Sequence, residues 1–279
     1  MRSNRHINKY PYIILGLIHL TMLVVTIYKS PNRKKSVVLL FNYAGFSYLF
    51  EYIVAVLCDA YAYKPNFLKQ KNLDNIFGSI CSQLFYVPVT ALFISVFSFG
   101  WKVKLIFSLY FALIEKLFIL LGSFKNHWWK TRYTFIIIFL SFFINDLWNE
   151  QLTKKNPFIL FISFFNLIQV TWMNTVYILA VLGKILYGMP PYFKWEEHFK
   201  VAPFFGFLTS FVLARWLKKD ALKANLKSFT FMLVKDLVLL NMRLLKTFNI
   251  ATLPIIYIIM ITSANKYKKL IYEEIDKEC

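Results

Sequence analysis

The acidic residues inside long apolar runs are the residues of this chain whose type and spacing are compatible with a chemical role. Glu51 lies deep in the apolar run 37–63, and Asp59 follows it eight residues later. On one helix the two carboxyls would stand about 80° apart around the axis and about 12 Å apart along it. They could line one polar stripe, which Tyr63 would extend by a turn, but they could not chelate a single ion.

An ionisable side chain within a membrane helix is costly to bury, so each one is a candidate for function. Glu51 and Asp59 could form part of a proton or cation path, or one of them could act as a general acid. The alternative is structural, because a carboxyl can also pair with a buried lysine or bridge two helices. The sequence leaves both interpretations open.

A second group of charged residues lies further along the chain. Glu115 and Lys116 are adjacent in the apolar run 103–122, and adjacent helical residues point about 100° apart, which makes them poor partners. Each then needs a partner on another helix, and Glu51 with Lys116 is one candidate pair. Lys184 falls near the end of the run 157–187.

The stretch 125–132, KNHWWKTR, has the composition of an interfacial belt. Trp128 and Trp129 would lie at headgroup depth. The basic residues that would face lipid phosphates are Lys125, Lys130 and Arg132. The alternative is a more specific lipid-headgroup site that includes His127. Further along, Asn145, Asp146 and Glu150 are interpreted as a solvated helix end.

Several classes of chemistry lack support in the sequence. The motifs HExxH, GxSxG, GxGxxG and the P-loop do not occur, and the four histidines are widely scattered. The three cysteines form neither a disulfide framework nor a metal-ligand spacing. We therefore expect no cofactor and no metal site, and neither metal-dependent hydrolysis nor nucleotide-driven transport is supported.

Composition predicts the elements that must position these residues. Of the 279 residues, 58% are hydrophobic and 17% are charged, whereas soluble domains carry about 25% charged residues. The apolar residues fall in runs near the 20 or so that a membrane helix needs. Nine runs are candidate helices: about 10–28, 37–63, 75–99, 103–122, 133–149, 157–187, 201–217, 229–247 and 250–265. Eight spans is the alternative, because 229–247 is rich in polar residues. The predicted fold is an all-α polytopic transmembrane bundle of eight or nine helices.

The net charge of +19 could suggest nucleic acid, but the basic residues form short clusters between the apolar runs. Beside a bilayer such clusters bind anionic phospholipid headgroups, at about 1 kcal/mol per residue. The expected partners are therefore the lipid bilayer, its anionic headgroups, and a membrane protein or a second copy of this chain. Nucleic acid is excluded. The basic clusters are nearly balanced between the two sides, so they leave the orientation open.

We predict one integral membrane domain over residues 1–279, with a short charged C-terminal tail at 266–279. The run 10–28 is too long for a signal peptide and lacks a cleavage site, so we expect a retained first helix. An internal match suggests two parallel-topology repeats of four helices, at about 10–125 and 133–265. YIVAVL at 52–57 recurs as YILAVL at 177–182, and Pro65 recurs as Pro190.

At this offset of 125 residues Lys184 takes the place of Asp59, a change of sign that would suit an ion pair between repeats. Many transporters are built from repeats. The alternative is a chance match between apolar segments of similar composition.

Polar residues at fixed places mark the stretch 48–132: FEY at 50–52, DAYAYKP at 59–65, LDN at 73–75, EK at 115–116, and KNHWWKTR. In these residues the chain resembles a family of uncharacterised multipass membrane proteins of Gram-positive spore-forming bacteria. The resemblance implies a location in the bacterial plasma membrane. It brings no activity with it.

Three functions are consistent with these observations. The one we favour is a small transporter or permease for an ion or small solute, with a polar path near the intramembrane carboxyls. The second is a structural or accessory subunit of a membrane complex, in which polar residues hold helices together. The third is an intramembrane enzyme acting on a lipid or isoprenoid, with a carboxyl as proton donor.

Overall fold

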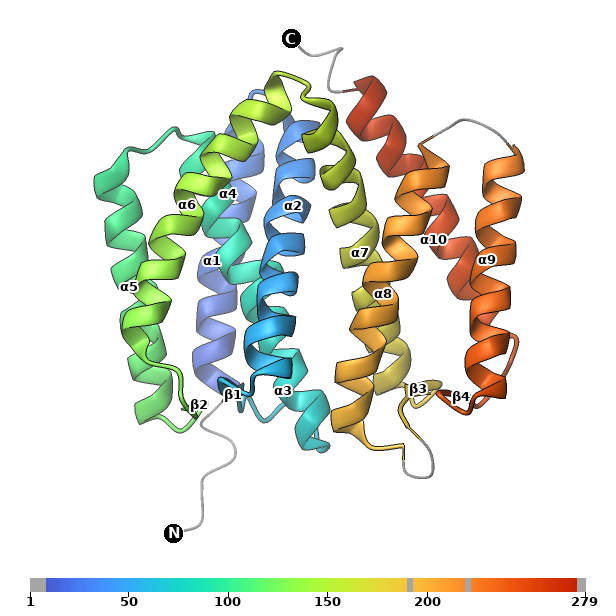
Figure 1. The fold of residues 1–279 in the computed structure, drawn as a ribbon. Coiled ribbons are helices and arrows are strands. Elements are labelled where there is room, and N and C mark those ends of the chain that lie inside the picture. Colours follow the sequence, from blue (N-terminus) through green and yellow to red (C-terminus); the bar gives the residue numbers. More distant parts are fainter. Residues whose placement is uncertain (1–8, 190–192, 219–221, 275–279) are drawn as a thin grey trace. The chain divides into compact units, whose positions relative to one another are not determined.

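The computed structural model describes residues 9–189, 193–218 and 222–274, and within these ranges the chain is mostly helical (Figure 1). Nine continuous helices occur there, three of which include a π-helical turn (η). Their bounds are α1 Lys9–Lys29; α2 Arg33–Glu51 with η1 Tyr52–Leu57; α3 Lys71–Ile80 with η2 Cys81–Tyr86 and α4 Val87–Val96; α5 Trp101–Leu120; α6 Thr131–Thr153; α7 Pro157–Val181; α8 Trp195–Leu217; α9 Leu222–Asn241; and α10 Thr252–Lys269 with η3 Leu270–Glu274. The predicted helical bundle is confirmed.

Five of these helices have the length and apolar composition needed to cross a membrane. They are Lys9–Lys29, Arg33–Leu57, Lys71–Val96, Pro157–Val181 and Trp195–Leu217. Local sequence explains several boundaries. The Asn32 side chain accepts a hydrogen bond from the Lys35 backbone N–H at 2.7 Å, which caps α2. Pro88 lies in the first turn of α4, directly after the π-helical turn η2, where the missing N–H and the bulky ring are accommodated.

Three of the predicted helices are too long, because each ends before a short strand. The runs 37–63, 157–187 and 229–247 end as helices at Leu57, Val181 and Asn241. The strands are β1 Tyr61–Tyr63, β2 Phe124–Asn126, β3 Ile185–Tyr187 and β4 Leu245–Thr247. Apolar and aromatic strand residues raise the hydropathy of a window as helical ones do, so periodicity cannot separate them.

Each strand pair is antiparallel. Tyr61 pairs with Asn126 and Tyr63 with Phe124, while in the second pair Ile185 faces Thr247. The strands link the end of one helix to the end of another, and they satisfy backbone groups that would otherwise be left open at the helix ends.

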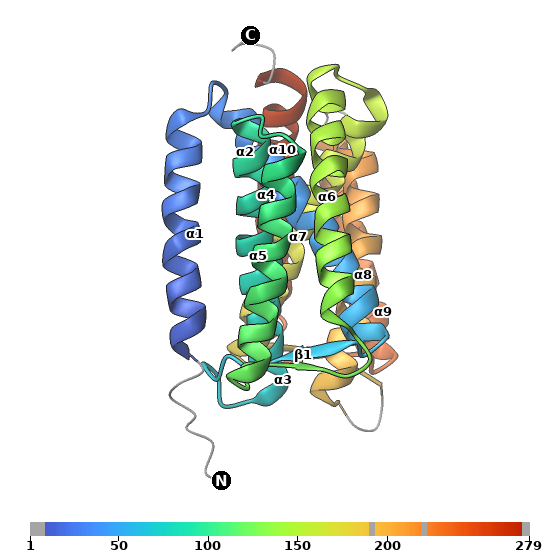
Figure 2. The same cartoon turned by 90° about the vertical axis from the view of Figure 1, so that its left-hand side faces the viewer.

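The chain divides into two compact units, Met1–Ile159 and Leu160–Cys279. In unit 1, α5 packs along α6, and α4 packs against α1 and α2 (Figure 2). The core of this unit is formed by apolar side chains such as Val38, Leu39, Val89 and Leu92, which are at most 2% exposed. In unit 2, α9 packs against α8 and α10.

The two units share one order of elements. After α1, unit 1 runs helix, strand, two helices, strand and helix, and unit 2 repeats this order from α7 to α10. The last backbone hydrogen bond of the helix before the first strand spans one residue more in unit 1 than in unit 2. After α2 and η1, the Ala60 N–H donates to Val54 O six residues back. After α7, the Lys184 N–H donates to Leu179 O five residues back. The π-helical turn η1 takes up the additional residue.

This insertion corrects one prediction. The offset is 125 residues at Val54 and Leu179 but 124 at Ala60 and Lys184, so Asp59 corresponds to Gly183 and not to Lys184. The backbone agrees, since Asp59 and Gly183 have φ of 48° and 66°. The predicted change of sign between Asp59 and Lys184 therefore does not occur.

The chain ends need one adjustment. The first helix is present as α1, and the residues before Lys9 lie outside the described ranges. The charged segment predicted as a tail at 266–279 is helical as far as Glu274. Residues 275–279 lie outside the described part of the chain.

Candidate functional site

Unit 1 contains a cavity of about 470 Å³ between α2, η2, α5, α6 and the strand pair β1–β2. This volume is typical of small-molecule sites in proteins. Aromatic and aliphatic side chains form most of the wall, including Phe46, Phe50, Tyr61, Phe118, Phe124 and Trp129. The polar side chains of the wall, apart from tyrosines, are Ser47, Ser82, Gln83, Glu115, Thr134, Ser141 and Asn145.

Glu51 lies behind this wall and holds two of its side chains. The carboxyl is 4% exposed, and its Oε2 accepts hydrogen bonds from the Tyr61 hydroxyl at 2.7 Å and from Gln83 Nε2 at 2.9 Å. Burial, followed by the nearby Glu51 carboxyl, raises the pKa of Tyr61 well above its ordinary value. The phenol therefore keeps its proton and donates to Glu51. Glu51 thus positions Tyr61 and Gln83 and does not itself line the cavity.

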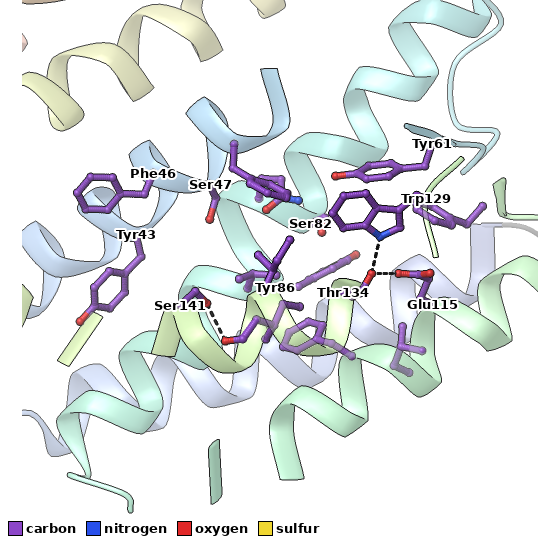
Figure 3. Close-up of a pocket in the computed structure, with 18 of the residues that line it drawn as sticks. Tyr43, Phe46, Ser47, Tyr61, Ser82, Tyr86, Glu115, Trp129, Thr134 and Ser141 are labelled. Atoms are coloured by element: carbon purple, nitrogen blue, oxygen red, sulfur yellow. Dashed lines mark hydrogen bonds between the residues drawn. The ribbon is translucent and has the colours of Figure 1, made fainter. Parts of the chain in front are cut away.

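Glu115 does line the cavity, and three side chains donate to it. Its Oε1 accepts from the Thr131 hydroxyl at 2.7 Å and the Asn126 amide at 3.2 Å, and its Oε2 accepts from the Thr134 hydroxyl. Trp129 Nε1 in turn donates to Thr134 Oγ1 at 2.7 Å (Figure 3). This chain of hydrogen bonds ties the start of α6 to α5 and holds the indole in the cavity wall.

The side chains that hydrogen-bond to Glu51 and Glu115 are all neutral tyrosine, serine, threonine, glutamine and asparagine groups. Both carboxyls are at most 9% exposed. Carboxylates buried in low dielectric usually pair with a cation, because an uncompensated charge is costly there. The surroundings of the cavity therefore have acidic character without a hydrogen-bonded cation among the described residues.

Two π-helical turns meet at this site. Glu51 is the residue before η1, Gln83 lies within η2, and the hydrogen bond between the two side chains joins the turns. Such turns are often found at functional sites, where one inserted residue re-aims the side chains that follow. The corresponding helices of unit 2, α7 and α8, are regular α-helices over their described lengths.

Tyr43 is another residue that lines the cavity wall (Figure 3). Its hydroxyl donates to the Asn145 carbonyl at 3.1 Å and lies 3.1 Å from Ser95 Oγ. Ser95 donates to Asp146 Oδ1 at 2.8 Å, and Lys104 forms an ion pair with Asp146. The interpretation of Asn145 and Asp146 as a solvated helix end is wrong, because helix packing brings both into this network.

The predicted polar stripe of Glu51, Asp59 and Tyr63 is also wrong. The helix ends at Leu57, so the three residues do not share a helical face. The Asp59 side chain is 81% exposed, and its Oδ1 lies 3.1 Å from His127 Nδ1. Tyr63 belongs to β1, and its ring forms part of the cavity wall.

The two candidate lysines are not intramembrane partners. Lys116 is exposed on α5, whereas Glu51 is buried and hydrogen-bonds to neutral side chains that include Tyr61 and Gln83, so the proposed pair of Glu51 with Lys116 does not form. Lys184 follows the end of α7 and is exposed, and its carbonyl accepts from the Phe248 backbone N–H at 3.2 Å.

The stretch 125–132 divides into two parts. Trp128 is 51% exposed, and its Nε1 donates to the Cys58 carbonyl at 2.7 Å. Trp129 is only 7% exposed and lines the cavity, so its side chain faces the interior of unit 1. Its predicted place at headgroup depth stays a prediction. The basic side chains that are exposed are Lys125, Lys130 and Arg132. Lipid contact by these residues stays a prediction.

Sequence reasoning missed four residues of the site, namely Tyr43, Tyr61, Gln83 and Thr134. Gln83 stands out as an amide in an otherwise apolar run, but its place in the sequence indicates no role. Tyr61 belongs to the DAYAYKP stretch but has no role assigned by it, and Tyr43 and Thr134 are hydroxyl residues with no distinguishing local pattern. Their roles follow from contacts across separate helices.

The site offers aromatic faces, a carboxyl and a few hydroxyl and amide groups around a largely apolar space. The described residues contain no group of three or more His, Cys, Asp or Glu side chains that could hold a metal ion. Comparisons of the chain with models of protein families, with curated proteins and with solved structures give no match. The function is therefore inferred from the site itself.

Proposed function

We propose that this chain is a multipass protein of the bacterial plasma membrane that binds a small, largely apolar solute in the cavity of unit 1 and carries it across the bilayer. The cavity and the make-up of its wall carry this proposal. The five apolar helices support a membrane location. The resemblance of residues 48–132 to bacterial multipass proteins supports the compartment.

The wall favours a solute over a bare ion. Metal ions such as Ca²⁺ and Mg²⁺ need about six or more oxygen ligands around one point, whereas the polar groups here are spread along an aromatic wall. An aromatic and aliphatic wall with a few polar groups is instead the usual make-up of a site for an organic molecule.

The hydrogen bonding favours binding over catalysis. Glu51 contacts Tyr61 and Gln83 from behind the wall, and Glu115 already accepts from three side chains. Groups held in this way fix the shape and charge of the cavity. A purely structural subunit would have no need of a cavity beside two buried carboxyls.

A variant that fills the cavity tests the proposal. Ser47→Trp on α2 places an indole in the cavity, and Leu49→Trp is the matched control, because Leu49 lies on the same helix and is 41% exposed. The full chain is purified in mild detergent and analysed by native mass spectrometry. We expect a small organic molecule on the wild type and on Leu49→Trp, and none on Ser47→Trp.

A second variant, Ser141→Leu on α6, fills the cavity from another helix and should have the same effect even if Ser47→Trp does not fold. The molecule so identified is then loaded into proteoliposomes, where we expect its efflux to depend on the wild-type cavity. Identical spectra for all variants, or a wild type without bound solute, would contradict the proposal. A bound lipid whose covalent structure changes in cells that make the protein would instead indicate an enzyme.

A further inference from the structure

We infer that the solute is an organic cation, an amine whose ammonium group lies beside Glu115 and whose apolar body fills the cavity. This inference rests on the proposed function, and it comes from a comparison of the cavity with the corresponding place in unit 2. There a lysine ammonium is buried against a carboxylate and an aromatic ring.

Helices α5 and α9, each the third helix of the element order that the two units share, correspond residue by residue. Helices α5 and α9 are both 20 residues long, and strands β2 and β4 follow them at the same spacing. The end of each helix has the same backbone bond, from the Ser123 N–H to Phe118 O and from the Leu244 N–H to Leu239 O, each 2.8 Å long. An offset of 121 residues relates all of these positions.

At this offset Glu115 corresponds to Asp236, and Ile114 corresponds to Lys235. Each acidic residue is buried and accepts from a hydroxyl on the fourth helix of its unit, Glu115 from Thr134 on α6 and Asp236 from Tyr257 on α10. Helices α5 and α9 therefore both carry this carboxyl, whereas the residue before it is isoleucine in α5 and lysine in α9.

Lys235 fills the corresponding place in unit 2 with a charge. Its Nζ lies 3.1 Å from Asp236 Oδ1, 3.2 Å from Thr209 Oγ1 and 5.9 Å from the centroid of the Trp172 ring. The Lys235 and Asp236 side chains are 10% and 4% exposed. A carboxylate and an aromatic face together are the usual surroundings of a buried ammonium group.

The counterparts of these residues line the cavity in unit 1. Ile114 takes the place of Lys235, and Ser47 takes the place of Trp172 at the offset of 125 that relates α2 to α7. Ile114 has a shorter side chain than lysine and carries no cation, and Ser47 is much smaller than tryptophan, while the carboxyl remains as Glu115. Unit 1 therefore keeps the acceptor for an ammonium group and leaves the space of the ammonium empty.

The charge of the site agrees with this assignment. The hydrogen-bond donors to Glu115 are neutral, so an incoming cation would find in the cavity wall a carboxyl that no cation among the described residues bonds. The aromatic rings of Tyr61 and Trp129 lie in the same wall and can contact the cation through their faces. An anionic solute would be repelled, because like charges in low dielectric interact strongly.

Three probes with the same eight-carbon chain test the inference: octylammonium, 1-octanol and octanoate. Their equilibrium binding is measured on the full chain in nanodiscs of zwitterionic lipid, with empty nanodiscs subtracted. We expect octylammonium to bind at least about tenfold more tightly than 1-octanol, which corresponds to about 1.4 kcal/mol, and octanoate to bind most weakly. Glu115→Gln should abolish the preference for octylammonium over 1-octanol.

A transplant of the lysine makes the test sharper. Ile114→Lys copies the ammonium of unit 2 into the cavity, and Ile114→Met is the matched control, since it is similarly long and uncharged. We expect Ile114→Lys to weaken octylammonium binding at least about tenfold relative to Ile114→Met, which should reduce the binding of octylammonium and 1-octanol to the same extent.

The outcomes separate this inference from the proposed function. Equal binding of octylammonium and 1-octanol, or unchanged octylammonium binding by Ile114→Lys, overturns the inference and leaves a neutral solute. Binding of none of the three probes above empty nanodiscs contradicts the proposed function itself. If Ile114→Lys does not fold, the loss or persistence of charge preference in Glu115→Gln decides the question.

Discussion

The hydrogen bond between the Tyr61 hydroxyl and Glu51 should couple β1 to α2, and a double-mutant cycle can measure it. The oxygens are 2.7 Å apart, and Glu51 also accepts from Gln83 at 2.9 Å. Tyr61→Phe removes one donor to a buried carboxyl, which costs about 1.5–3 kcal/mol. Glu51→Ala leaves the Tyr61 hydroxyl buried without this acceptor, at about 1–3 kcal/mol, and leaves Gln83 Nε2 with the Tyr63 hydroxyl at 3.5 Å.

The double variant loses the donor and the acceptor together, so its cost should be smaller than the sum of the single costs by about 1.5–3 kcal/mol. The assay is reversible unfolding of the full chain in mixed micelles, followed by helical circular dichroism. Combining Glu51→Ala with Tyr28→Phe is the control, because Tyr28 is 70% exposed, and these costs should add within about 0.5 kcal/mol. A coupling of Glu51 with Tyr61 no larger than that of the control pair would refute the reasoning.

Two further predictions concern packing and charge in unit 1, measured by the same unfolding assay. A Cβ at Gly78 would lie 2.5 Å from Tyr63 Cβ, so Gly78→Ala should lower the free energy of unfolding by about 1–3 kcal/mol. A Cβ at Gly100 would have nothing within 4 Å, so the control Gly100→Ala should change the free energy of unfolding by less than about 0.5 kcal/mol. Equal effects would show that the helix can shift away from Tyr63. Asp146→Asn leaves the Lys104 ammonium buried without its carboxylate and should lower the free energy of unfolding by about 3 kcal/mol. Lys104→Met leaves the Asp146 carboxylate, whose side chain is 38% exposed, and should lower it by less. The reverse order would contradict this account of the pair.

Much of the helical framework is predictable from the sequence. Residues such as Pro31, Pro65 and Pro157 lie at or near breaks between the apolar runs, and the nine runs correspond to the nine continuous helices of the described ranges. The errors fall at strands β1, β3 and β4, where apolar residues continue past the helix end. The hydropathy of these residues is the same whether they are helical or extended. A strand is therefore identified only by its pairing partner, which lies some 60 residues away in each case.

The candidate site is predictable only in part. Glu51 and Glu115 stand out as carboxyls within apolar runs, and both are buried. Their partners do not stand out, because Tyr61, Gln83 and Thr134 become partners only when separate elements pack together. The expected partner Lys116 points elsewhere, since adjacent residues on a helix face directions about 100° apart.

The sequence by itself determines the helical apolar segments, because the free energy of placing a helix in a membrane is summed locally over about 20 neighbouring residues. It also determines which charged residues interrupt them. Only the tertiary structure decides what those residues contact. One residue inserted at η1 or η2 turns the side chains that follow by about 100°. The hydrogen bond of Glu51 with Gln83 and the cavity beside Glu115 therefore depend on how whole helices rotate and pack. The same holds for the ion pair of Lys235 with Asp236 at the corresponding place in unit 2.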